Sequence, residues 1–102
     1  MAYGEVTSVP SFATTTIVSQ VVAVPKTSVK GFFASGTVNA LFKLQVNGVT
    51  FLSGRSTVSQ QTVKEKTQKS SITANAGDTV ALTVIHEVSG VLANFEGTIL
   101  GV

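Results

Sequence analysis

The stretch Ala76-Gly-Asp-Thr-Val-Ala-Leu-Thr-Val-Ile-His86 has the alternation of side chains that is typical of a β-strand. Successive side chains of a strand point to opposite faces of a sheet. One face of this strand is then fully apolar and consists of Val80, Leu82 and Val84. Gly77-Asp78 precedes these residues and suits a tight turn. The stretch therefore predicts a strand that is entered through a turn and buries one face.

A second alternating run, Ala93-Asn-Phe-Glu-Gly-Thr-Ile-Leu100, follows the turn pair Ser89-Gly90. Phe95 and Ile99 share its apolar face, whereas Glu96 lies on the opposite face. We interpret the two runs as an antiparallel pair of strands. Because such a pair is stable only when another layer covers its apolar face, we expect a second sheet.

The first half of the chain contains a clear hairpin signal. Val38 to Asn47 alternates, and Asn47-Gly48 suits a type I′ turn, in which both central residues need positive φ. The return strand is expected at Val49 to Leu52. Phe12 to Val24 and Lys26 to Ser35 are also rich in β-forming residues.

The polar segment from Ser56 to Ser71 has no apolar face for a helix to bury. We expect an exposed edge strand and a loop here, followed by a short strand at Ser71 to Ala74. Lysines on an edge strand discourage unwanted pairing, and three are present: Lys64, Lys66 and Lys69.

Residues 1–11 are interrupted by Pro10 and are interpreted as an extended N-terminal arm, with a single domain over residues 12–102. Tyr3, Val6 and Val9 are spaced three apart, so they do not share a strand face, and they are the candidate anchors of this arm. A frayed terminus is the alternative.

About eight strands without a convincing helix predict an all-β fold, an antiparallel β-sandwich or jelly roll. The apolar faces of its best strands form the predicted core, which consists of Ala40, Phe42, Leu44, Val46, Val80, Leu82, Val84, Phe95 and Ile99.

Charged residues make up 12% of the chain, against about 25% in typical soluble domains. Some apolar surface is therefore expected to be buried against other chains, which predicts a homo-oligomer. The candidate interface residues are apolar residues on the outward faces of good strands, namely Leu41, Ile85 and Leu100.

The net charge of +2 is a small imbalance, so nucleic-acid binding is not indicated. The chain contains no cysteine and therefore no disulfide or thiolate site. Its start lacks the pattern of a secretory signal, and no apolar run approaches the roughly 20 residues of a membrane-spanning helix. Synthesis in a host cytoplasm and no membrane insertion are expected.

The sequence offers no catalytic, cofactor-binding or metal-binding motif. His86 is the only histidine, and the five acidic residues form no cluster with metal-ligand spacing. A Ser-His-Asp arrangement with Asp78 lacks a nucleophile motif. We therefore interpret His86 as a partly buried, hydrogen-bonded histidine at the end of a sheet.

Four charged residues have simple interpretations. Asp78 is expected to accept hydrogen bonds from turn amides. Arg55, the only arginine, suits a carboxylate or a backbone carbonyl at an interface, or a loop cap. Glu96 and Lys43 are candidates for a pair across a sheet or a subunit boundary.

Residues 77–84 and the run Phe95-Glu-Gly-Thr-Ile-Leu-Gly101 resemble the end of small jelly-roll domains in tailed-bacteriophage virion proteins. In such proteins a strand like Asn39-Ala-Leu-Phe-Lys-Leu-Gln-Val-Asn-Gly48 comes earlier, followed by an arginine and a threonine, as at Arg55 and Thr57. The similarity covers roughly Thr14 to Gly101, and trimeric domains of the C1q and tumour-necrosis-factor type end in a related way. The resemblance implies a non-enzymatic virion part, often a trimer.

A chain that begins at Met1 and holds this domain without a long stalk is similar to capsid decoration, or cement, proteins. These proteins bind the major capsid protein on the virion surface and stabilise the head. The N-terminal arm, through Tyr3, Val6 and Val9, is then the candidate tether that contacts the capsid. The alternatives are a tail or baseplate adhesin and a carbohydrate-binding receptor module. An adhesin or lectin is expected to carry exposed aromatic platforms, and this chain has no tryptophan and one tyrosine.

Overall fold

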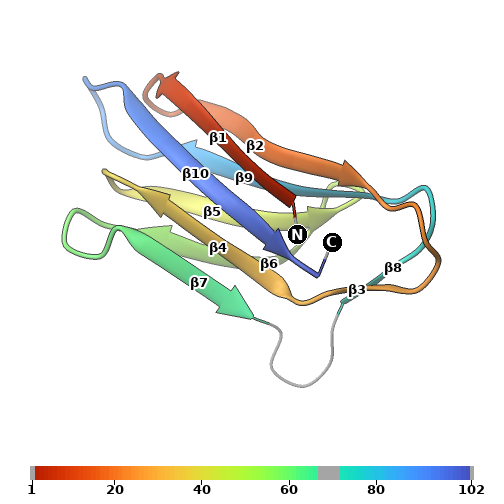
Figure 1. The fold of residues 1–102 in the computed structure, drawn as a ribbon. Helices are drawn as coiled ribbons and strands as arrows, with labels where there is room; N and C mark the ends of the chain where they lie inside the picture. Colours follow the sequence, from red (N-terminus) through yellow and green to blue (C-terminus); the bar gives the residue numbers. More distant parts are fainter. Residues whose placement is uncertain (1, 67–71, 102) are drawn as a thin grey trace.

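The computed structural model describes residues 2–66 and 72–101, and Figure 1 shows them as two packed antiparallel sheets. Sheet A has the order β1 (Ala2–Val9), β10 (Ala93–Leu100), β4 (Gly31–Gly36) and β7 (Thr62–Lys66). Sheet B has the order β2 (Thr14–Val21), β9 (Thr79–His86), β5 (Ala40–Val46) and β6 (Val49–Ser56). A short third pair joins β3 (Thr27–Val29) to β8 (Ile72–Ala74).

The order of the strands is that of a jelly roll. Each four-stranded sheet combines strands from both halves of the chain, and every pairing is antiparallel. The predicted all-β sandwich is therefore confirmed. The described residues form ten strands where eight were expected, because the N-terminal segment forms β1 and the run from Lys26 to Ser35 is divided into β3 and β4.

The predicted pairing of the two alternating runs is wrong. They form β9 and β10, which lie in different sheets and face each other across the core. Residues 87–92 carry the chain from sheet B to sheet A instead of closing a hairpin. Each run finds its partners elsewhere, because β9 pairs with β2 and β5 while β10 pairs with β1 and β4.

The N-terminal segment is a strand of the sandwich and not a separate arm. β1 pairs with β10 from Ala2↔Ile99 onward and forms one edge of sheet A. The register shifts between Val6 and Val9, where Ser8 has a φ of 54°. This bulge turns Val9 into the core, where it is 3% exposed, while Tyr3 remains 58% exposed on the outer face.

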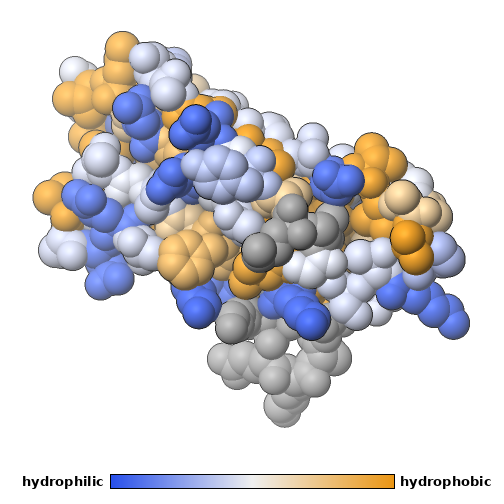
Figure 2. Space-filling model, viewed as in Figure 1, coloured by the Kyte–Doolittle hydropathy of each residue, from blue (hydrophilic) through white to orange (hydrophobic). Residues whose placement is uncertain are grey.

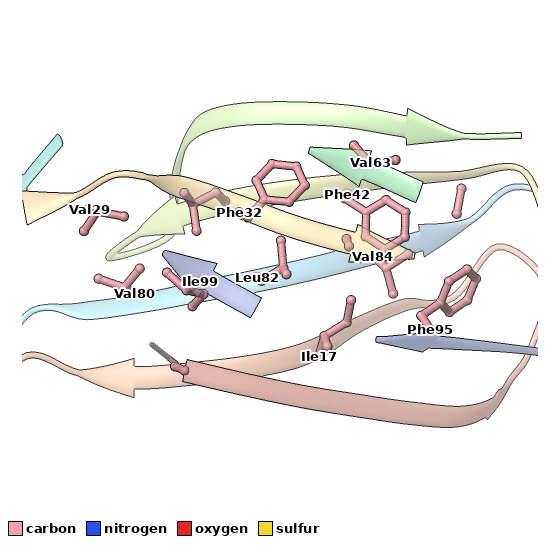
Figure 3. Packing of buried hydrophobic residues seen from close by; sticks show 14 of the residues in the cluster. Ile17, Val29, Phe32, Phe42, Val63, Val80, Leu82, Val84, Phe95 and Ile99 are labelled. Carbon is pink, nitrogen blue, oxygen red and sulfur yellow. The ribbon is translucent and has the colours of Figure 1, made fainter. Parts of the chain in front are cut away.

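The core lies between the two sheets (Figure 3), and all nine predicted core residues are buried. At one end of the core, the Phe95 ring packs edge-to-face against the Phe42 ring, with centroids 5.8 Å apart. It also packs edge-to-face against the His86 ring, with centroids 5.9 Å apart. Gly36 leaves the room for this ring, since a Cβ atom there would come within 2.5 Å of it. Phe32, Val29, Ile17 and Val63 also belong to the core and come from strands whose sequence patterns are less regular.

The turns predicted at Asn47-Gly48 and Gly77-Asp78 are confirmed. Asn47 and Gly48 have φ values of 50° and 82° and connect β5 to β6. At the second turn, Gly77 has a φ of 93° and the Asp78 N–H donates to the Asn75 carbonyl (3.0 Å).

β7 is an edge strand of sheet A that carries an exposed Lys64. Lys69 and Ser71 lie outside the described residues. Among the residues that are described, no helix is long and apolar enough to cross a membrane.

Candidate binding surfaces

Four connections meet at one end of the sandwich, on the left in Figure 1, and we call this the loop end: residues 10–13, 37–39, 57–61 and 87–92. Hydrogen bonds tie down three of these connections, at residues 10–13, 37–39 and 87–92. The Phe12 N–H donates to the His86 carbonyl (2.7 Å), and the Glu87 N–H donates to the Asn39 carbonyl (3.1 Å). The Ser11 hydroxyl donates to the Val91 carbonyl (3.3 Å). The loop end is therefore a preorganised surface.

His86 holds the connection at residues 87–92 from inside the core. Its side chain is fully buried, the Val88 N–H donates to Nδ1 (3.2 Å), and Nε2 lies 2.9 Å from the Val91 carbonyl oxygen. Since Nδ1 accepts, the ring proton lies on Nε2 and donates to Val91. The prediction of a hydrogen-bonded histidine at a sheet end is confirmed, and its burial is complete.

The loop end carries an apolar patch that consists of Phe12, Val91 and Leu92. Phe12 and Leu92 are each 65% exposed, and Val91 is 46% exposed. Phe12 has a φ of 62°, a conformation that is unfavourable for an aromatic residue and persists only when surrounding contacts impose it. Figure 2 shows hydrophobic residues gathered at the upper left, where these connections lie. Such an exposed apolar group is a candidate contact surface.

The outer face of sheet A carries a second feature, a hollow of about 440 Å³ at the start of β10. Its walls come from β1, β4, β10, the start of β7 and the adjoining residues Thr37 and Gln61, and most of the lining residues are polar. The hydroxyl, amide and carboxylate residues of its lining are Glu5, Thr7, Ser35, Thr37, Gln61, Thr62, Asn94 and Glu96. No lysine or arginine lines it. We call it the sheet A hollow.

Glu96 is one of the lining residues of this hollow, and two hydroxyl groups orient its carboxylate. The Tyr3 hydroxyl donates to Oε2 (2.8 Å) and the Ser35 hydroxyl donates to Oε1 (2.9 Å). Glu5 is the register partner of Glu96 on β1, so two carboxylates lie on neighbouring strands. The hydrogen bond to Glu96 and the negative charges of Glu96 and Glu5 raise the pKa of Tyr3 to about 12. The Ser8 N–H donates to Oδ1 of Asn94 (3.0 Å), which fixes a further wall residue.

A smaller hollow of about 150 Å³ continues from the first across the same face. Ser35, Thr62 and Glu96 line both, and Tyr3 and Phe33 add aromatic rings to the smaller one. The Phe33 ring is 41% exposed and has Lys64 Nζ 5.7 Å from its centroid. The two hollows together form an elongated surface with polar and aromatic parts.

The structure brings together two of the three candidate interface residues. Leu41 and Ile85 are register partners on the outer face of sheet B, and both are partly exposed. Leu100 is also partly exposed, but it lies on β10 in the opposite sheet. The three residues therefore cannot form one patch within a single chain.

The predictions for charged residues have different outcomes. Arg55 pairs with a carboxylate of its own chain, since its Nε lies 3.1 Å from Glu87 Oε1. Asp78 accepts from the Asn75 N–H at 2.8 Å, which confirms its role in the turn. Glu96 and Lys43 lie on strands of different sheets, so a pair across one sheet is excluded. Among the described residues, no three His, Asp or Glu side chains are grouped to hold a metal ion.

The sequence did not reveal the sheet A hollow. Its walls come from residues as far apart as Glu5 and Glu96, which only the β1–β10 pairing makes neighbours. The apolar patch was not predicted either, because the pattern around Phe12 indicates a strand and Leu92 lies in a segment that connects two strands. A comparison with models of known protein families and with curated proteins finds no match for this chain.

Proposed function

We propose that this protein is a non-enzymatic virion structural protein that decorates and stabilises a bacteriophage head. The observation that carries the proposal is the apolar patch of Phe12, Val91 and Leu92 on a loop end whose connections are fixed by hydrogen bonds. A rigid surface loses little conformational entropy when it docks on another protein. The jelly-roll order of the strands is also the fold that the sequence resemblance implies, which supports the proposal by analogy.

The proposed partner of the apolar patch is the major capsid protein, and the proposed assembly is a homotrimer. Three copies in one rigid body bind neighbouring capsid subunits at a high effective concentration, so weak contacts at each loop end add up to tight attachment. The outer face of sheet B is the proposed trimer contact, because Leu41 and Ile85 lie side by side there.

The structure limits how the N-terminal segment can contact a neighbouring protein. As β1 is an edge strand of sheet A, residues 2–9 are not free to reach a neighbour as a tether. Val9 is buried and is not available for contact, whereas Tyr3 and Val6 lie on the exposed edge strand. An edge strand can still pair with a strand of another protein.

The proposal is tested by binding of the purified protein to heads that lack it, followed by heating. The wild-type protein is expected to bind and to raise the temperature at which the heads release DNA. Phe12→Ser with Leu92→Ser is expected to abolish binding, because it removes the apolar contact. Val49→Ser is the matched control: Val49 is 59% exposed at the opposite end of the sandwich.

Two results contradict the proposal. One is binding to heads that is unchanged in the Phe12→Ser, Leu92→Ser variant while the variant remains folded by circular dichroism. The other is labelling of the tail tip, and not of the head, by antibodies in electron microscopy of virions. The second result favours the tail or baseplate adhesin.

A further inference from the structure

The sheet A hollow has features that the proposed attachment through the loop end does not use. It reaches the loop end at Thr37 and Gln61, but none of the three residues of the apolar patch lines it, and it combines two neighbouring carboxylates with hydroxyl and amide side chains. Carboxylates directly opposite each other on paired strands repel and destabilise the pair. No basic residue in the lining of the hollow offsets this repulsion.

The Glu96 carboxylate can accept further hydrogen bonds. A carboxylate has about four lone-pair positions, and the hydroxyl groups of Tyr3 and Ser35 occupy one on each oxygen of Glu96. These two bonds fix the orientation of the carboxylate before any ligand arrives. Its remaining lone pairs are available for donors on a ligand that enters the hollow.

We propose that the sheet A hollow binds a neutral saccharide. Sugar hydroxyl groups can donate to the remaining lone pairs of the Glu96 and Glu5 carboxylates, while the side-chain amides of Asn94 and Gln61 both donate to and accept from hydroxyl groups. The volume of about 440 Å³ lies within the range of about 300–1,000 Å³ that is usual for small-molecule sites.

The aromatic rings beside the hollow fit the same ligand class. Tyr3 pairs with Thr98 in register, yet its hydroxyl reaches Glu96 two residues along β10, so the side chain runs along the outer face of the sheet. Its 58% exposure leaves ring surface for the apolar C–H face of a pyranose. The smaller hollow, with Tyr3 and Phe33, provides room for a second sugar unit of an oligosaccharide.

A metal ion fits the hollow less well, because the described residues supply no group of three acidic or histidine ligands. A basic peptide would satisfy the carboxylates, but it would leave most of the hydroxyl and amide lining unused. A saccharide can form hydrogen bonds with the carboxylates and also with the hydroxyl and amide groups of the lining. The experiment distinguishes a saccharide from a metal ion and from a basic peptide.

The test uses the full chain labelled with ¹⁵N and a panel of soluble neutral tetrasaccharides of glucose, galactose, mannose and N-acetylglucosamine. At least one is expected to bind saturably, with chemical-shift changes confined to β1, β4, β10, the start of β7 and the adjoining residues Thr37 and Gln61. Tyrosine fluorescence provides a second reading, because Tyr3 is the only tyrosine and the chain lacks tryptophan.

Variants connect the binding to the hollow. Glu96→Gln and Asn94→Ala are each expected to weaken binding about tenfold, the effect of losing a hydrogen bond to a charged or well-placed polar group. Tyr3→Ala is expected to weaken it as well, whereas Tyr3→Phe keeps the ring and loses less. Glu87→Gln is the matched control, since Glu87 is an acid at the loop end and does not line the hollow.

The proposal is overturned if none of the tetrasaccharides binds, or if Glu96→Gln and Asn94→Ala leave the affinity unchanged. Binding of hexalysine or of calcium chloride that Glu96→Gln abolishes, without saccharide binding, also overturns it. The proposal does not rest on attachment to a phage head. Variants of the loop end and of the hollow can therefore fail separately.

Discussion

The side-chain amide of Asn47 donates to Oδ1 of Asp78 at 3.0 Å and links the tip of the β5–β6 hairpin to the turn that enters β9. Two further bonds strengthen this link. The Thr79 N–H donates to Asn47 Oδ1 (2.9 Å), and the Asn47 N–H donates to the Thr79 carbonyl (2.8 Å). Two turns that the sequence predicts separately thus form one hydrogen-bonded unit.

Asp78 is expected to make the stability of the fold depend on pH in the acidic range. Hydrogen bonds from the Asn75 N–H and the Asn47 amide lower the pKa of its carboxyl below the ordinary value of 3.8. A lowered folded-state pKa adds stability that is fully present above pH 3.8 and is lost as the pH falls through the folded value.

The measurement is urea unfolding of the wild type and of Asp78→Asn at several acidic pH values. The difference in unfolding free energy between them is expected to shrink as the pH falls. Asn47→Ala removes the other side of the link and is expected to reduce the same pH dependence. A difference that stays constant from neutral pH to well below pH 4 contradicts this role of Asp78.

Tyr3 is expected to ionise at unusually high pH. Its pKa is raised from the ordinary value of 10.0 to about 12, mainly by the hydrogen bond that it donates to Glu96. A raised folded-state pKa means that the bond stabilises the fold below pH 10 and that this stabilisation is lost as the pH rises through about 12. Ultraviolet titration of tyrosinate measures it directly, because Tyr3 is the only tyrosine.

Glu96→Gln is expected to move the midpoint of this titration toward 10. Far-ultraviolet circular dichroism along the same titration shows whether the chain is still folded at each pH. A midpoint near 10 in the folded wild-type protein would show that the bond between Tyr3 and Glu96 does not hold in solution.

Phe95→Ala is expected to lower the free energy of unfolding by about 3–5 kcal/mol, a large part of the stability of a small domain. The ring fills the space that Gly36 leaves and contacts both Phe42 and His86. Phe33→Ala is the matched control, because Phe33 is 41% exposed on the outer face. Chemical denaturation measures the loss of unfolding free energy in each variant. Equal losses would contradict the packing described for Phe95.

The sequence predicts which faces are buried much better than it predicts which strands pair. The period of two in β5, β9 and β10 depends only on local geometry, so Phe42, Leu82 and Phe95 are correctly placed in the core. A run with one buried face looks the same whether its neighbour pairs beside it or faces it across the core. The partners of β9 and β10 are decided by contacts between distant parts of the chain.

At the N-terminus, a β-bulge explains why the sequence pattern does not predict the strand β1. Val6 and Val9 are three residues apart, a spacing that does not fit one face of a regular strand. The irregularity at Ser8 reverses the alternation, so that the strand continues and Val9 still points inward. The sheet A hollow was missed for the same reason, because it needs β1 in place beside β10.

Ile85→Lys and Val84→Lys are neighbouring substitutions on β9 with opposite expected effects. Val84 is fully buried, so a lysine there places an unpaired charge in the core and is expected to unfold the chain. Ile85 is partly exposed and lies beside Leu41 on the outer face of sheet B. A lysine at this position can reach solvent in a monomer, but it becomes buried in an oligomer that packs through this face.

Ile85→Lys is therefore expected to give folded monomers where the wild type forms the proposed trimer. Light scattering measures the mass, and circular dichroism shows that the β-structure persists. Leu100→Lys serves as the comparison, since Leu100 lies on sheet A and is expected to leave an oligomer formed through sheet B intact. A wild-type protein that stays monomeric at high concentration, or an Ile85→Lys variant that keeps the wild-type mass, excludes sheet B as the contact.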